Sequence, residues 1–125
     1  MSLDRSQADL MVEQLKMLAQ PQRLMILSAL LEGERAVGEI EAMTGIGQPA
    51  LSQQLAELRR ANLVTPRREA RQIFYSIASD AVNDRIRTLF AALGAPVPHR
   101  TVREDKLPTT HKRALTGAAA FARIG

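Results

Sequence analysis

The stretch GIGQPALSQQLAELRRANL at residues 45–63 decides the fold of this chain. Gly45 accommodates the left-handed conformation that ends a helix, and Pro49 suits the first turn of the next helix, where its missing N–H is not needed. Three leucines then recur at the spacing i, i+4, i+7, so that one stripe faces a core: Leu51, Leu55 and Leu58. The stretch therefore predicts a turn, an amphipathic helix and the start of a strand.

The opposite face of that helix carries side chains that form hydrogen bonds. At about 100° per residue, Gln53 and Arg60 fall almost opposite the leucine stripe, and Ser52 and Gln54 fall on its flanks. Amide, hydroxyl and guanidinium groups bind base edges and phosphates, so this face is a candidate DNA-recognition surface. An ordinary surface helix with a solvated polar face gives the same short pattern.

Three further helices are predicted before this stretch. Residues 4–19 form the first, and PQRLMILSALLEGE forms the second, which opens at Pro21 and stops near Gly33. Residues 36–44 form a short third helix that Gly45 ends. The third helix, the glycine turn and the polar-faced helix together make a helix-turn-helix.

A β-hairpin is predicted after the helix-turn-helix. Residues 64–68 and 72–77 show the pattern of two strands, joined by a turn at 69–71. A hairpin in this place is a wing, and basic side chains on it reach phosphates or a minor groove. Three arginines lie on or near its tip: Arg67, Arg68 and Arg71. A solvated basic hairpin is the alternative interpretation.

Residues 79–93 predict a fifth helix, with Ser79 as its N-cap. Its apolar residues are spaced 4, 3, 4, which makes a seam suited to another helix. The first helix has an apolar face of its own, and a small domain gains stability by pairing both faces. We therefore expect a homodimer through the first and last helices, although such a seam also suits the core of one chain. The expected contact residues are Leu15, Leu18, Val82, Ile86, Leu89, Phe90 and Leu93.

The 125 residues predict one folded domain over 1–94 and a tail over 95–125. The tail has several prolines, no periodicity and six basic against two acidic residues, so we expect it to be disordered. Within the domain, residues 48–71 carry five basic and two acidic residues, whereas 1–47 carry four and seven. The positive charge thus gathers on the recognition helix and the wing. This asymmetry favours a polyanionic partner, with a chance cluster as the alternative.

The composition also argues against several classes of protein. There is no cysteine, which excludes disulfides and thiolate metal sites, and His99 and His111 fall in the predicted tail. The sequence shows no nucleophile–base pair, phosphate-binding glycine loop or metal cluster, so we expect no enzyme, cofactor or metal. No apolar run approaches the roughly 18 residues of a membrane span, and the start MSLDRSQADL is unlike a signal peptide. We expect a soluble, cytoplasmic protein with no membrane partner.

The segments LAQPQRLMILSALLEGE, VGEIEAMTGIGQPALSQQLAELRRANLV and RREARQIFYSI resemble the ArsR family of small winged-helix repressors. Within that family, GIGQPALSQQL looks most like the BigR group of sulfur-responsive repressors. The resemblance implies a mainly α winged helix-turn-helix dimer that binds an inverted-repeat operator in double-stranded DNA and blocks transcription. It also implies that four residues contact the major groove, with the wing arginines on the DNA backbone: Gln48, Ser52, Gln53 and Gln54.

The inducer is where the chain departs from its apparent relatives. Metal-sensing members bind through cysteines in the third helix or through acidic and histidine ligands on the last, and VGEIEAMTG and AVNDRIRTLFAAL lack cysteine and histidine. BigR-like members use two cysteines that become linked through sulfur. The resemblance places these at Ser28 and near Ala91, and neither is a thiol. Three explanations stay open: a constitutive repressor, a non-covalent sensor in the apolar space around Ser28, or a replaced cysteine.

Two other functions also fit the sequence. An architectural DNA binder would use the basic wing and tail on phosphates without an operator, and would lack the ~10³-fold preference of a specific binder over random DNA. A helix-turn-helix used only for protein contacts would keep its partner after charge reversal at Arg60, Arg67 and Arg68, because the pairing would run through apolar helices.

Overall fold

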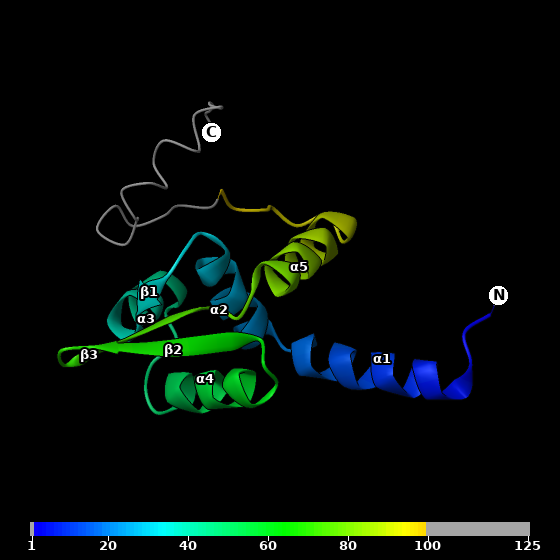
Figure 1. The fold of residues 1–125 in the computed structure, drawn as a ribbon. Coiled ribbons are helices and arrows are strands. Elements are labelled where there is room, and N and C mark those ends of the chain that lie inside the picture. The colour runs from blue at the N-terminus through cyan, green and yellow to red at the C-terminus, as the bar shows by residue number, and fades with distance from the viewer. Residues whose placement is uncertain (1, 100–125) are drawn as a thin grey trace, which may run out of the picture.

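The computed structural model describes residues 2–99, and these form five helices and three strands (Figure 1). The elements follow one another along the chain as α1 Arg5–Leu18, α2 Pro21–Leu31, β1 Arg35–Ala36, α3 Val37–Thr44, α4 Ala50–Arg60, β2 Val64–Glu69, β3 Gln72–Ile77 and α5 Asp80–Ala92. The winged helix-turn-helix predicted from the sequence is confirmed. Each predicted helix is present within one or two residues of its expected bounds, except that α2 ends at Leu31, before Gly33.

The sheet has three strands, and the predicted two-stranded wing was incomplete in this respect. Strand β3 lies in the middle, with β1 and β2 antiparallel on either side of it. Phe74 of β3 stands opposite Ala36 of β1 and opposite Arg67 of β2. Strand β1 follows α2 and pairs with β3, so it attaches the hairpin to the body of the domain through the sheet.

The core is aliphatic and is centred on α2. Its fully buried side chains come from α2, α3, α4 and β2: Ile26, Leu27, Leu30, Leu31, Ile40, Leu51, Leu55, Leu58 and Val64. Burying one such side chain contributes about 1.5–3 kcal/mol relative to leaving it in water. The three leucines of α4 are all at most 1% exposed, which confirms the predicted stripe. The leucine stripe therefore holds the recognition helix against α2.

Local signals set the end of α3 and the start of α5 as expected. Gly45 has a φ of 76° and ends α3, and its N–H donates to the carbonyl of Glu41. The hydroxyl of Ser79 accepts a bond from the N–H of Val82 at 3.1 Å and caps α5. Pro49 stands one residue before α4 rather than inside its first turn.

Helix α1 differs from the other helices because none of its residues is buried. It extends away from the body of the domain (Figure 1). Leu10 is 62% exposed and Leu15 is 51% exposed, so much of its apolar face is open to solvent in the single chain. Among the described residues, no helix combines the length and apolar content needed to cross a bilayer.

The segment after α5 stays attached to the domain for several residues. The guanidinium of Arg87 donates to the carbonyl of Pro98 at 2.6 Å and to the carbonyl of Leu31 at 2.6 Å. The same side chain donates to Asn83 Oδ1 at 2.7 Å. The chain after residue 94 is thus hydrogen-bonded to α5 at Pro98, and residues 100–125 of the predicted tail lie outside the described residues.

Candidate nucleic-acid interface

The turn before α4 and the first turn of α4 share a hydrogen-bonded side chain. Oε1 of Gln48 accepts from the backbone N–H of Ser52 at 3.1 Å and from its hydroxyl at 2.7 Å. A helix leaves its first N–H groups without intrahelical partners, and Pro49 at the N-cap has no side-chain acceptor to offer. Gln48 takes that role, which places both predicted major-groove residues together at the exposed start of α4.

Gln53 and Arg60 occupy the outer face of α4, as predicted, and both are exposed. Nη2 of Arg60 lies 2.7 Å from Oε2 of Glu57 one turn earlier. An exposed ion pair of this kind contributes about 0–1 kcal/mol, so a phosphate competes with it at little cost. The outer face therefore presents one amide and one cation that are open to a ligand.

Gln54 is half-buried, and its amide is bonded to α2 rather than directed outward. Its Oε1 accepts from Nε of Arg23 at 2.8 Å, and its Nε2 donates to Oε1 of Gln22 at 3.3 Å. The sequence placed Gln54 with the base-contacting residues because it lies on the flank of the helix. Neither Arg23 nor Gln22 was identified from the sequence, because no local pattern links residues more than thirty positions apart.

Arg67 is held within the protein. Its Nε and Nη2 each lie 2.9 Å from a carboxylate oxygen of Glu34, and its Nη1 lies 2.7 Å from Oε1 of Glu69. The guanidinium also stands 4.7 Å from the ring centroid of Phe74, a cation–π distance. The hydrogen bonds from Glu34 and then Glu69 raise the pKa of Arg67 above its ordinary value, so it is charged at every accessible pH.

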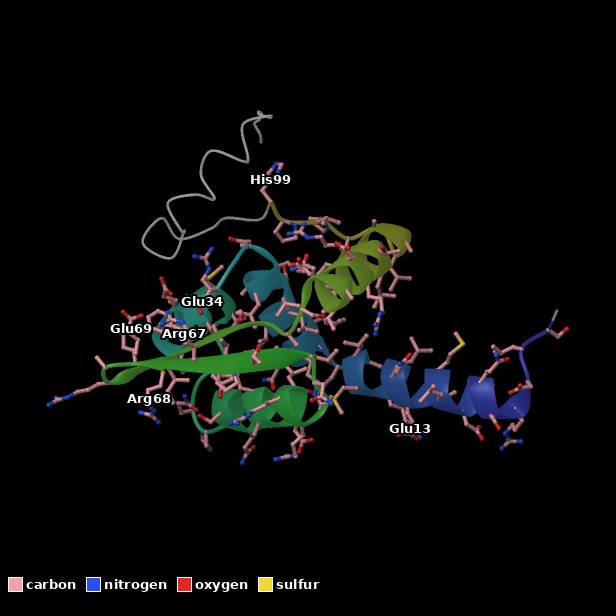
Figure 2. The ribbon with its side chains drawn as sticks, viewed as in Figure 1. Glu13, Glu34, Arg67, Arg68, Glu69 and His99 are labelled. Atoms are coloured by element: carbon pink, nitrogen blue, oxygen red, sulfur yellow. The ribbon has the colours of Figure 1, made fainter. Side chains whose placement is uncertain are left out.

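Arg68 and Arg71 are the exposed cations of the wing. Successive side chains of a strand point to opposite faces, and Figure 2 shows Arg67 with Glu34 and Glu69 on one side of the sheet and Arg68 on the other, where α4 lies. Arg71 belongs to the turn between β2 and β3. Neither Arg68 nor Arg71 has an ion-pair partner among residues 2–99. The wing and α4 thus present basic and polar groups on the same side of the domain.

The residues expected at a dimer interface divide into two sets. Ile86 and Phe90 are buried in the core of the single chain, and Leu18 and Val82 pack partly against that core. The core of the single chain therefore uses part of the predicted seam. Leu93 is 75% exposed, as α5 ends there. A groove of about 600 Å³ runs between α1 and α5, and its lining includes Leu15, Leu18, Val82, Ile86 and Leu89. Most of the predicted residues therefore border this single groove.

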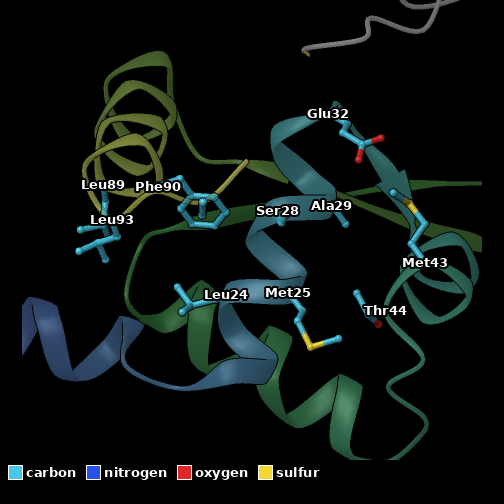
Figure 3. Close-up of a pocket in the computed structure, with 11 residues that line it drawn as sticks. Leu24, Met25, Ser28, Ala29, Glu32, Met43, Thr44, Leu89, Phe90 and Leu93 are labelled. Carbon is cyan, nitrogen blue, oxygen red and sulfur yellow. The ribbon is translucent and has the colours of Figure 1, made fainter. Parts of the chain in front are cut away.

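Ser28 lines a second groove, of about 480 Å³, between α2, α3 and α5 (Figure 3). Its lining is mostly apolar and includes Leu24, Met25 and Phe90. Ala91 is exposed and is not among the lining residues of this groove, whereas its neighbour Phe90 is. Along α5, the positions that border the Ser28 groove are Leu89, Phe90 and Leu93.

The described part of the chain holds no group of three His, Cys, Asp or Glu residues that would suit a metal ion. His99 is exposed after α5, and His111 lies outside the described residues. The polar and basic residues on α4 and the wing are therefore the candidate binding site of this domain.

A helix-turn-helix with an exposed polar face, followed by a hairpin that carries the exposed Arg68 on the same side, defines a winged-helix DNA-binding domain. The chain belongs to the arsR family of bacterial regulatory proteins, whose family model matches residues 20–65. It is 52% identical over 82 residues to the biofilm growth-associated repressor of Agrobacterium fabrum, a match that covers 66% of this chain and 70% of the relative. It is 50% identical over 68 residues to the nodulation protein NolR of Rhizobium meliloti, covering 54% and 56%.

Solved structures agree with this family. The transcriptional repressor BigR from Xylella fastidiosa superposes with a TM-score of 0.64 at 41% identity, covering 73% of this chain and 93% of that one. HlyU from Vibrio cholerae also gives 0.64, at 39% identity, covering 71% and 97%. The family consists of transcriptional regulators and not of enzymes.

Proposed function

We propose that this protein is a transcriptional repressor that binds an inverted-repeat operator as a homodimer. The observation that carries the proposal is the shared side of the domain on which the outer face of α4 and Arg68 lie. The amide of Gln53 reads base edges in a major groove, the hydroxyl of Ser52 and the amide of Gln48 contact bases or phosphates at the start of α4, and Arg60, Arg68 and Arg71 bind phosphates.

The proposed dimer is built on α1 and α5. An apolar helix face that is half exposed in one chain gains free energy when a second copy covers it. Helix α1 has such a face, and the groove beside it continues onto α5. A two-fold dimer places two copies of α4 in successive major grooves, about 34–36 Å apart, which is the geometry of an inverted-repeat operator.

Some of the named relatives support repression, but one of them is called an activator. The relatives from Agrobacterium fabrum and Xylella fastidiosa are called repressors, whereas HlyU from Vibrio cholerae is called a transcriptional activator. A dimer that covers a promoter blocks polymerase, so we propose repression as the direct effect of binding. Because its proposed partner is chromosomal DNA, we place the protein in the cytoplasm.

We propose that this chain does not respond to its inducer by forming a sulfur link between the two switch positions. A serine hydroxyl is not a thiolate and an alanine has no reactive atom, so Ser28 and Ala91 form no polysulfide. The open alternatives are a constitutive repressor, a non-covalent ligand in the Ser28 groove, and a chain in which serine has replaced a cysteine at position 28.

The test of the proposed function is competition between DNA sequences. Duplexes are selected from a random-sequence pool with the full chain, and the recovered duplex is compared with a scrambled duplex of the same length and composition. We expect the recovered duplex to bind at least about 10³-fold more tightly at physiological salt. Equal affinities would instead assign the protein to the architectural class.

A further inference from the structure

We propose that Arg23 and Gln54 form a positioning pair that fixes the recognition helix α4 relative to α1, and so sets the half-site spacing that the dimer accepts. The proposal rests on the dimeric, operator-binding function described above. It assigns Gln54 a role different from that of its neighbour Gln53, although both are glutamines on the same helix.

The first part of the argument is the amide of Gln54. Both of its polar atoms have partners on α2: Oε1 accepts from Nε of Arg23 at 2.8 Å, and Nε2 donates to Gln22 at 3.3 Å. A hydrogen bond with an ionised donor is roughly twice as strong as a neutral one. To read a base, Gln54 would have to give up this charged partner and leave Arg23 half-buried without it. Gln53 is exposed, and its amide has no such bond to another residue in the described range 2–99.

The second part is the other end of Arg23. Its Nη1 donates to the backbone carbonyl of Met17 at 3.0 Å. Met17 lies in the last turn of α1, where carbonyl groups lack intrahelical donors and where the helix dipole is negative. Arg23 itself is the third residue of α2, where the dipole of its own helix is unfavourable to a cation. Its two partners outside α2, Met17 and Gln54, offset that cost.

The third part is the joint between α1 and α2. Only Ala19 and Gln20 separate the two helices, and α1 buries none of its residues in the single chain. Only Leu18, at the end of α1, packs partly against the core, so core packing constrains the direction of α1 weakly. Arg23 spans this joint, because one guanidinium bonds the end of α1 with one nitrogen and the side of α4 with another.

The consequence for DNA binding follows from the two-fold symmetry. If α1 builds the dimer, the angle between α1 and α4 sets the separation and tilt of the two recognition helices. The leucine stripe fixes the inner face of α4 against α2. Gln54 orients the guanidinium of Arg23, and Arg23 links the α2–α4 unit to α1 through the carbonyl of Met17. Loss of the Arg23–Gln54 bond should let the two recognition helices of the dimer adopt more than one separation.

The experiment measures spacing preference and base preference separately. The duplex recovered from a random-sequence pool is compared with duplexes whose half-sites are moved by one or two base pairs, and with duplexes that carry single base changes inside a half-site. We expect the intact chain to prefer its own spacing by about tenfold or more, since a rigid dimer matches one separation. Gln54→Ala should reduce this preference to less than about threefold and keep the base preference. Gln53→Ala, the matched control, should do the reverse.

Two further variants separate positioning from DNA contact. Gln54→Glu keeps an acceptor for Arg23, so the spacing preference should be retained; a carboxylate at a DNA-contacting position would instead lose most of the affinity through repulsion by phosphates. Arg23→Met keeps the aliphatic stem and should reproduce the effect of Gln54→Ala. The double variant should show no larger loss than either single one, because both changes break one link.

The outcomes are distinct. The proposal is overturned if Gln54→Ala loses base preference at particular positions while spacing preference stays intact, or if the Arg23→Met and Gln54→Ala effects add. If the intact chain does not distinguish the recovered duplex from a scrambled one, the proposed function fails and this inference fails with it. Sedimentation and circular dichroism of each variant establish that it folds and dimerises before these affinities are compared.

Discussion

Helices α1 and α4 are both amphipathic, but their apolar faces have different surroundings. In α4, Leu51, Leu55 and Leu58 are at most 1% exposed, whereas α1 buries none of its residues and leaves Leu15 51% exposed. One chain thus supplies the whole of the surface that α4 needs and little of the surface that α1 needs. The difference supports the proposal that one chain completes the packing of the recognition helix and that a second copy covers the apolar face of α1.

The largest expected effect comes from breaking the pairing of α1 and α5. Leu89→Asp places a charge in the groove between these helices and should weaken dimer association by about 3–5 kcal/mol, because the carboxylate is buried without a partner. Sedimentation at low micromolar concentration should show a monomer. Ala91→Asp, on the exposed side of α5, is the control and should stay dimeric. A dimeric Leu89→Asp variant would show that α5 is not at the interface.

The same substitution, leucine to alanine, in each of the two helices tests the difference between α1 and α4. Leu55→Ala should lower the free energy of unfolding by about 2–5 kcal/mol, because it opens a cavity in the core. Leu15→Ala should lower it by less than about 1 kcal/mol, since its side chain is half in water already. Denaturant unfolding in the Leu89→Asp background removes the contribution of dimerisation. Similar losses in both variants would mean that α1 packs on its own domain.

A smaller effect is expected on the outer face of α4. Gln53→Ala should remove about 1–3 kcal/mol of discrimination at particular base pairs, since an amide makes paired bonds to one base and not to others. Affinities for the recovered duplex and its single-base variants measure this loss. An equal loss on every sequence would argue that Gln53 contacts the backbone instead.

The smallest expected effect separates the two neighbouring arginines of the wing. Arg68→Ala should weaken binding to all sequences by about 1 kcal/mol per chain and reduce the slope of log K against log salt by about 0.9 per chain, because one phosphate contact is lost. Arg67→Met should leave that slope unchanged, as its guanidinium is bonded to Glu34 and Glu69. A slope that falls equally in both variants would place Arg67 on DNA as well.

The helices and the wing were predictable because their signals are local. The leucine spacing of α4, the left-handed Gly45 and the Ser79 cap each involve residues within one or two turns of one another. Strand β1 was not predictable, because two residues have no period and Ala36 pairs with Phe74 on a distant strand. Propensity and periodicity predict a single helix or strand, whereas the pairing of two strands depends on how distant segments of the chain meet in the fold.

The site residues show the same limit. The sequence placed Gln53 opposite the leucine stripe and Gln54 on its flank, but it could not show that Gln54 bonds to α2. It placed Arg67 and Arg68 on one strand, but it could not tell which of the two is bonded within the protein. The partners that decide it are Arg23, 31 residues before Gln54, and Glu34, 33 residues before Arg67. Likewise, the α5 seam spacing suited a partner helix, and the core of the single chain takes Ile86 and Phe90.

The most direct test of the central claim is a hydroxyl-radical footprint of the full chain on the recovered duplex. A dimer that is joined through α1 and α5 and reads DNA with two copies of α4 should protect two symmetric segments whose centres are about one helical turn apart, 10–10.5 base pairs. Leu89→Asp should reduce the protection of both segments together. A single protected segment, or uniform protection along the duplex, would contradict the account.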